Sequence, residues 1–458
     1  MLPPSDRRVD DTTNNDDHKE LHIAPMLHVS TTEFRAFLRI LTKRAVIWTE
    51  MVVDETLQHA PRGKDGMVAE SILSHIYAHE KEHPMIAQIG ASRCDWLRTS
   101  MQLVQAAGYT YGIDLNLDCP SSRVQSRKFG AMLMQDADTV CQLVQTMREC
   151  AMHENVRISI KCRIGVDDCT SYEWLCDFIR QMSTTCQRFM LHGRCVWLKG
   201  LSPAQNRLVP PLHYGTIYRI CQAFPDCDFW INGGISTLGD ARKLVHGVEE
   251  THVAPETLNT PCPHCNLPYG SCKAAPLYPA PTNLRGCLLG RVAMDNPAIF
   301  ADVDRFWYGE PSNPCANRRD VLDRYCNVLE EMYPSRCCDG DNDNWTAVYP
   351  APQNIERYAM HCPICCTDPS ISFADDVIRE RSQQPIKIKQ GVVDRCVKPI
   401  MNLFFGIPGG ARDFRRAVDT RRMDTRIRNC GPSYILQQAV QDVIPDALLD
   451  QPFVPTAV

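Results

Sequence analysis

The sequence lacks any apolar run of the roughly 18 to 20 residues that a membrane-spanning helix needs. Residues 1–20 are polar and acid-rich, and they contain no apolar segment of the kind found in secretory signals. They also lack the Arg- and Ser-rich, acid-poor composition of organelle transit peptides. These absences exclude an integral membrane protein and argue against secretion. We expect a cytoplasmic protein whose residues 1–20 form a disordered tail.

The sequence also lacks a Gly-x-Gly-x-x-Gly turn after its first predicted strand, which argues against a doubly wound dinucleotide-binding sheet. Instead, eight β-rich runs recur: His22–Met26, Val46–Met51, Met85–Ile89, Ile113–Leu117, Arg157–Cys162, Phe189–His192, Phe229–Asn232 and Gly286–Gly290. Stretches with helical spacing lie between most of them, including Thr32–Lys43, Asp95–Ala107, Ala137–Met147, Tyr172–Met182 and Leu238–Val245. This alternation predicts a parallel (β/α)₈ TIM barrel over residues 21–310, with the open sheet as the alternative.

A helical domain is predicted after the barrel, over residues 311–450. Helical spacing occurs in Pro297–Phe306, which should close the barrel, and in Asp320–Met332, Val392–Phe405 and Ala411–Val418. The net charge of the chain is −5, yet Arg379–Arg428 contains thirteen Lys and Arg residues against five Asp and Glu residues. This window indicates either a polyanion-binding surface or a helix with a solvated basic face.

Cysteine is abundant, with 24 residues in a chain without a secretion signal, so we expect reduced thiols rather than a disulfide framework. Two Cys-x-x-Cys pairs, Cys262 with Cys265 and Cys362 with Cys365, lie in apparent insertions at about 249–284 and 333–376. Two such pairs can hold one zinc ion tetrahedrally. The two alternatives for these cysteines are therefore a structural zinc site and reduced cysteines without a metal.

Polar residues follow almost every predicted strand. Catalytic groups of a TIM barrel come from the C-terminal ends of its strands, so these residues predict one pocket. Cys119 lies directly before Pro120, which cannot continue a sheet ladder, at the end of the fourth strand. The glycines after the seventh and eighth strands, together with Arg291, predict a phosphate subsite.

The chain resembles the tRNA-dihydrouridine synthases, most closely their A-type bacterial branch. The matching stretches are Ile23–Met26 (IAPM), Trp48–Met51 (WTEM), Asn116–Ser121 (NLDCPS), Arg123–Gln125, Phe129–Ala131, Lys161–Asp168 (KCRIGVDD), Leu191–Arg194, Gly200–Pro203, Ile231–Ile235 (INGGI), Leu289–Arg291, Asn296–Pro297 and Phe405–Arg412 (FGIPGGAR), followed by Arg415 and Arg416. The resemblance extends over nearly all of residues 21–448 apart from the two insertions.

The resemblance implies an FMN- and NADPH-dependent enzyme that reduces the C5–C6 double bond of a uridine in the tRNA D-loop, at position 20 or 20a. It implies that Cys119 donates a proton to C5 while reduced flavin delivers a hydride to C6. The implied flavin-binding residues are Pro25, Met26, Gln88, Lys161, His192, Asn232, Gly233, Gly234, Gly290 and Arg291. The implied tRNA-binding residues are Glu50, Asn116, Arg123, Arg194, Arg412, Arg415 and Arg416.

Two residues depart from the family pattern. Asp118 stands where the family usually has Gly before the cysteine, and Met132 stands where the A-type branch has Cys. A carboxylate close to Cys119 should raise the pKa of the thiol, which suits a proton donor. Alternatively, Asp118 crowds the strand end and impairs the enzyme. A small-molecule flavin oxidoreductase of the dihydroorotate or dihydropyrimidine type and a catalytically idle tRNA-binding protein are the competing functions.

Overall fold

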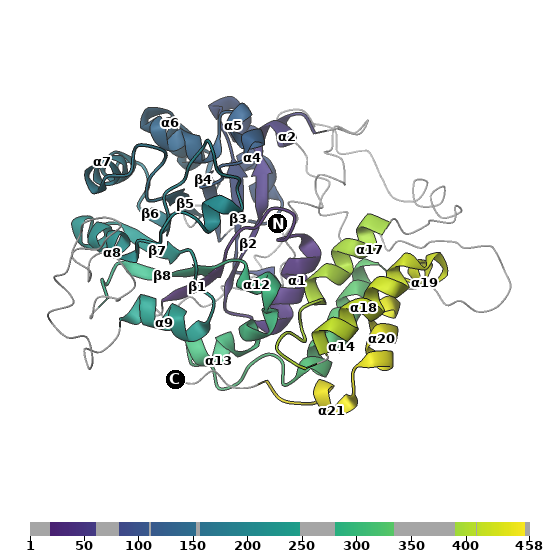
Figure 1. Ribbon diagram of the computed structural model, residues 1–458. Helices are drawn as coiled ribbons and strands as arrows, with labels where there is room; N and C mark the ends of the chain where they lie inside the picture. Colours follow the sequence, from purple (N-terminus) through teal and green to yellow (C-terminus); the bar gives the residue numbers. More distant parts are fainter. Residues whose placement is uncertain are drawn as a thin grey trace, which may run out of the picture.

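The computed structural model describes residues 19–60, 82–109, 111–152, 156–247, 280–333, 390–408 and 410–453. Eight parallel strands form a closed barrel in sequential order (Figure 1). They are β1 (Glu20–Ile23), β2 (Val46–Val53), β3 (Met85–Gly90), β4 (Gly112–Leu117), β5 (Arg157–Arg163), β6 (Arg188–His192), β7 (Asp228–Asn232) and β8 (Leu284–Leu289). The predicted TIM barrel is confirmed, and the open-sheet alternative is wrong.

Helices surround the strands of the barrel. They are α1 (Thr32–Leu41), α2 (Asp54–Gln58), α4 (Cys94–Ala106), α5 (Ser122–Ser126), α6 (Ala137–Cys150), α7 (Tyr172–Met182), α8 (Tyr214–Ala223), α9 (Leu238–His246), α12 (Val292–Asp295) and α13 (Val303–Tyr308), with 3₁₀ segments η2 (Gly130–Gln135), η3 (Gln205–Arg207) and η4 (Pro297–Asp302). Their apolar faces pack on the outside of the strands in one large core. A smaller apolar cluster, which includes Trp48 and Trp230, comes from the opposite faces of the strands and fills the barrel interior.

The barrel closes where β1 pairs with β8. Glu20 lies opposite Gly286, and a Cβ added to Gly286 would lie 1.9 Å from the backbone oxygen of Glu20. Only glycine allows this approach. Lys19 Nζ donates to the backbone oxygen of Leu284 at 2.6 Å. Lys19 and Glu20, which the sequence assigned to the tail, therefore belong to the ordered barrel.

The C-terminal region is helical, as predicted. It consists of α14 (Arg318–Met332), α17 (Gln390–Val397), η5 (Lys398–Ile400), α18 (Gly410–Met423), α19 (Thr425–Asn429), α20 (Pro432–Val443) and α21 (Asp446–Leu449). Figure 1 shows α1 between the strands and these helices. The interface between α1 and the C-terminal helices is partly polar. Buried Glu33 of α1 accepts hydrogen bonds from the Tyr333 hydroxyl at 2.7 Å and from Arg395 Nε at 3.2 Å.

Several predicted helices differ from those observed. The closing helix Pro297–Phe306 is two elements, η4 and α13. The helix expected over Val392–Phe405 ends at Val397, and a 3₁₀ turn with Pro399 follows it. Among the described helices of ten or more residues, α8 and α20 were not predicted individually.

The structure bears only in part on the expectations about membrane helices and zinc. None of the described helices is long and apolar enough to cross a membrane. The proposed zinc ligands Cys262, Cys265, Cys362 and Cys365 lie outside the described residues, so zinc binding stays a prediction.

Candidate active site

Cys119 lies two residues beyond the end of β4, on a loop fixed by side chains. The backbone N–H groups of Asp118 and Cys119 both donate to Asn116 Oδ1, at 3.3 and 3.2 Å. The oxygen of Cys119 accepts the N–H of Ala131 at 3.0 Å. Gly130 permits this approach, because its φ is +74° and a Cβ there would lie 2.6 Å from that oxygen. The loop therefore holds the half-buried Cys119 in a fixed place.

A buried chain of hydrogen bonds supports Asn116 from within the barrel. Asn116 Nδ2 donates to Gln88 Oε1 at 3.0 Å, and Gln88 Nε2 donates to Asp114 Oδ2 at 2.8 Å. Ser159 Oγ donates to the other oxygen of Asp114 at 2.9 Å. Burial raises the pKa of Asp114 to about 8, so the folded protein favours the neutral carboxylic acid. The amides of Gln88 and Asn116 are thus engaged within the protein.

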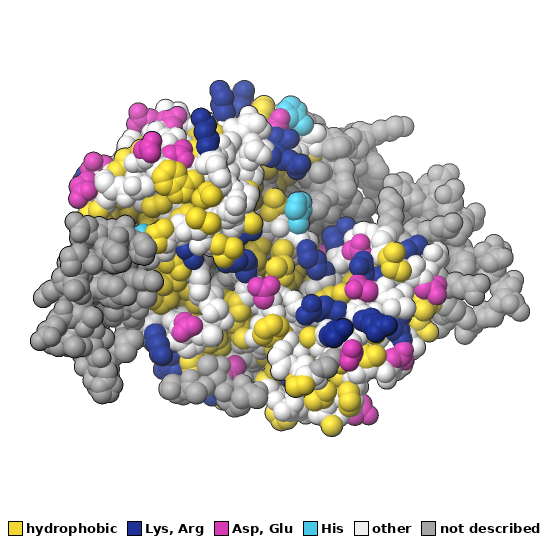
Figure 2. Space-filling model, in the orientation of Figure 1, with side chains coloured by type: hydrophobic (Ala, Val, Ile, Leu, Met, Phe, Trp, Pro, Cys, Tyr) yellow, Lys and Arg dark blue, Asp and Glu magenta, His cyan; other side chains and the backbone are white. Residues whose placement is uncertain are grey.

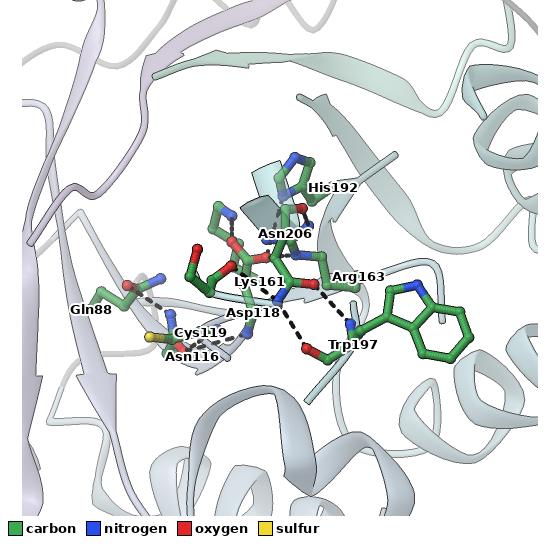
Figure 3. A network of polar contacts seen from close by, with 10 residues as sticks. Gln88, Asn116, Asp118, Cys119, Lys161, Arg163, His192, Trp197 and Asn206 are labelled. Atoms are coloured by element: carbon green, nitrogen blue, oxygen red, sulfur yellow. Dashed lines mark hydrogen bonds and ion pairs between the residues drawn. The ribbon is translucent and has the colours of Figure 1, made fainter. Parts of the chain in front are cut away.

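Three nitrogen-bearing side chains from β5 and β6 converge on the carboxylate of Asp118 (Figure 3). Lys161 Nζ and Arg163 Nε form ion pairs with its two oxygens, and His192 Nδ1 lies 3.3 Å from Oδ1. Although burial opposes ionisation, Arg163 and Lys161 hold the pKa of Asp118 well below its usual range. Burial and the nearby Arg163 lower the pKa of His192 to about 3, so its ring is neutral. We call these four side chains the Asp118 cluster.

The thiol of Cys119 stays protonated near neutral pH. Burial raises its pKa, and the carboxylate of Asp118 adds to this effect, while hydrogen bonds from Ser121 oppose it. The expected influence of Asp118 on the thiol has the predicted direction, but burial is the larger cause. A protonated thiol can act as a general acid.

The sequence did not single out Asn206, which ties the Asp118 cluster to the loop after β6. Arg163 Nη1 donates to the backbone oxygen of Asn206 at 3.1 Å. The Asn206 side chain, which is fully buried, accepts the N–H of Trp197 and donates to its oxygen, both at 2.8 Å. Asn206 follows the Gly200–Pro203 stretch, and that proximity was its only sequence signal.

The turn after β7 contains the two glycines for which the sequence predicts a phosphate subsite. Gly233 and Gly234 have φ values of +111° and +69°. A Cβ would lie 2.5 Å from His192 Cδ2 at Gly233 and 2.5 Å from Leu212 Cδ1 at Gly234. Asn232 Nδ2 donates to the backbone oxygen of Leu288 at 2.8 Å, which joins this turn to β8.

The remaining predicted barrel residues lie in the C-terminal half of a strand or in the segment that follows it. Pro25 and Met26 are half-buried after β1, and Gly290 and exposed Arg291 follow β8. Glu50 on β2 accepts the N–H of His28 and so braces the loop that carries Met26. Arg194 donates to the backbone oxygen of Pro210, and Arg123 is exposed on α5 next to the Cys119 loop.

The three predicted arginines of the C-terminal region lie apart from the barrel residues. Arg412, Arg415 and Arg416 are exposed on α18 and line one shallow depression of about 390 Å³. Figure 2 shows Lys and Arg side chains gathered over the C-terminal helices. In the described part of the chain these three arginines have no ion-pair partner, whereas Arg421 and Arg422 of the same helix pair with carboxylates.

Comparison with known proteins decides the family. Residues 22–262 match the family model described as dihydrouridine synthase. The chain belongs to the dihydrouridine synthase family. It is 36% identical to the tRNA-dihydrouridine(20/20a) synthase of Escherichia coli, over 68% of this chain and 77% of that protein. It is 34% identical to the enzyme of the same name from Yersinia pestis, over 68% of this chain and 74% of that protein.

Among solved structures, an old yellow enzyme homologue from Zymomonas mobilis aligns with a TM-score of 0.39 and 11% identity, over 64% of this chain and 90% of that chain. Morphinone reductase in complex with tetrahydroNAD aligns with a TM-score of 0.37 and 10% identity, over 64% and 88% of the two chains.

Membership of the dihydrouridine synthase family implies flavin and nicotinamide cofactors. The residues at the barrel mouth fit a flavin. Gly233 and Gly234 have the positive φ values that expose backbone N–H groups in a tight turn, and exposed Arg291 after β8 carries the charge that a phosphate subsite needs. Lys161 and His192 offer hydrogen-bonding nitrogens deeper in the mouth, although both already contact Asp118.

Proposed function

We propose that this protein is a tRNA-dihydrouridine synthase that uses FMN and NADPH to reduce a D-loop uridine, at position 20 or 20a, to 5,6-dihydrouridine. The observation that carries the proposal is Cys119, a protonated thiol fixed beside the Asp118 cluster at the barrel mouth. The relatives named tRNA-dihydrouridine(20/20a) synthase support the substrate and the product.

Each proposed flavin-binding residue lies in the C-terminal half of a strand or in the loop after it. Gly233, Gly234, Gly290 and Arg291 would hold the phosphate, and Pro25, Met26, Gln88, Lys161, His192 and Asn232 would surround the ring. When bound and reduced by NADPH, FMN supplies the hydride that goes to C6 of the uracil.

The role of Cys119 is to supply the proton. Saturating the C5–C6 bond requires one hydride and one proton, and the thiol of Cys119 would give its proton to C5. Asn116 keeps the thiol in place through the two backbone N–H groups that it accepts. The raised pKa of Cys119 keeps the proton on sulfur until the substrate arrives.

The target base must leave its stack to enter the barrel, so the RNA backbone must be held elsewhere. Arg412, Arg415 and Arg416 on α18, which have no ion-pair partner among the described residues, would provide charge for that grip, and exposed Arg123 lies beside the Cys119 loop. Glu50, Asn116 and Arg194 would act nearer the base. A free pyrimidine needs no such basic surface, which disfavours the small-molecule oxidoreductase.

The test is single-turnover oxidation of the reduced protein by unmodified tRNA, with Cys119→Ala compared with Cys94→Ala on α4. We expect Cys119→Ala to slow the reaction by a factor of about 10² to 10⁴ and Cys94→Ala to leave the rate unchanged. Full activity of Cys119→Ala would show that Cys119 is not the proton donor. Colourless protein that still binds tRNA would support the idle tRNA-binding alternative instead.

A further inference from the structure

The carboxylate of Asp118 has no role in the proposed reaction. This carboxylate contacts Lys161, Arg163 and His192 at once, and these side chains are 3%, 3% and 8% exposed. Since His192 is neutral, Asp118 leaves the cluster with one net positive charge instead of two. Figure 3 shows Lys161, Arg163 and His192 around this carboxylate.

We infer that Asp118 is a built-in counter-ion that lowers the reduction potential of the bound flavin. The inference rests on the proposed function, in which Lys161 and His192 contact the flavin ring. Asp118 thereby makes the reduced cofactor a stronger hydride donor toward uracil.

The physical basis is the charge that the flavin gains on reduction. An oxidised flavin takes up two electrons and one proton and becomes an anion, with one more negative charge than before. Buried cations beside the ring favour this anion, and their effect is stronger than in water because the surroundings are less polar. Asp118 cancels one of the two cations, so the protein binds the reduced form less tightly relative to the oxidised form.

Asp118 also orders the cluster. Without its carboxylate, Lys161 and Arg163 would be two buried like charges without their shared partner. A purely structural role would affect folding and the place of Cys119, but it would not shift the potential in a direction set by charge. The reduction potential therefore separates the two roles.

The experiment compares the flavin midpoint potential of the purified holoprotein with that of Asp118→Asn, by reductive titration against a reference dye. The amide keeps the shape of the side chain and removes its charge. We expect a rise of about 30 mV or more, which corresponds to a tenfold gain in binding of reduced over oxidised flavin.

The affinity of the flavin for sulfite is a second measure of the charge around the ring, and it needs no electron donor. The sulfur lone pair of sulfite forms one S–N bond at flavin N5 while the N5=C4a double bond opens and its electron pair moves toward N1, so the adduct carries additional negative charge on the ring system. Asp118→Asn should therefore bind sulfite about tenfold more tightly, as measured by bleaching of the flavin absorbance.

Asp228→Asn is the matched control. Asp228 also faces two arginines, with Arg285 Nε at 2.7 Å and Arg188 Nη1 at 3.7 Å, but it begins β7 at the opposite end of the barrel. This variant should leave both the potential and the sulfite affinity unchanged. Asp118→Gly is a second variant in case the amide disturbs folding.

An unchanged potential in both Asp118 variants would overturn the inference, and so would an equal shift in Asp228→Asn. Loss of flavin from both Asp118 variants would also overturn it, because a residue that only tunes the potential is not required for binding. Wild-type protein that binds no flavin would instead refute the proposed function.

Discussion

Asp114 gives the stability of the barrel a specific dependence on pH. Its carboxyl group is fully buried and accepts hydrogen bonds from Gln88 and Ser159. Burial raises its pKa to about 8 from the ordinary value of 3.8. Asp114→Asn should fit the same space, because an amide oxygen can accept from Gln88 while the amide N–H donates to Ser159.

The magnitude follows from proton binding. Between pH 3.8 and about 8, the folded protein holds one proton on Asp114 that the unfolded chain has released. The free energy of unfolding therefore falls by about 1.4 kcal/mol for each pH unit, by proton linkage. The contribution of the protonated group is fully present below pH 3.8 and is lost as the pH rises toward 8.

The assay is urea unfolding of wild type and Asp114→Asn at several pH values, followed by tryptophan fluorescence. Trp48 and Trp230 are buried inside the barrel and report on its unfolding. Groups shared by both proteins cancel in the difference between their free energies of unfolding. That difference should shift in favour of the variant by about 3 kcal/mol between about pH 5.5 and 7.5. Parallel pH profiles would show that Asp114 is ionised in the folded protein.

Two further changes test the fold and the RNA surface. Gly286→Ala places a Cβ against the backbone of Glu20 and should lower the free energy of unfolding by about 3 kcal/mol or more in urea denaturation. Gly239→Ala, on α9 with free space around it, should stabilise by up to about 1 kcal/mol, and equal effects would contradict the close contact. Arg415→Ala should weaken tRNA binding and reduce the slope of log affinity against log salt by about 1, as measured by filter binding. Arg180→Ala, an exposed arginine on α7, should leave both unchanged, and the same loss in each variant would argue against a specific surface on α18.

The strands and the polar residues at their ends could be read from the sequence because both are local properties. Each strand is a short apolar run. Because functional groups of such barrels gather at the C-terminal strand ends, the sequence predicts that Asn116, Lys161 and His192 lie at one mouth of the barrel. Helix α8 was not singled out, although its share of buried residues, six of ten, equals that of the predicted helix α1.

The partners of Asp118 could not be predicted, because pairing depends on distances in space. Lys161, Arg163 and His192 are 43, 45 and 74 residues away along the chain. The sequence marked Asp118 as unusual only through the family resemblance, and it suggested crowding rather than a shared ion pair. Asn206 was missed for the same reason, since its role depends on Arg163 reaching its backbone oxygen.

His28 gives the two halves of the molecule a mechanical connection. Its backbone N–H donates to Glu50 of the barrel, and its oxygen accepts a hydrogen bond from Lys398 Nζ at 2.9 Å. Its φ of +60° holds the peptide in a turn that few residues adopt. A displacement of the C-terminal helices would therefore pull on the loop that carries Pro25 and Met26. We expect that binding of a bulky RNA to the C-terminal helices displaces this loop at the mouth of the barrel.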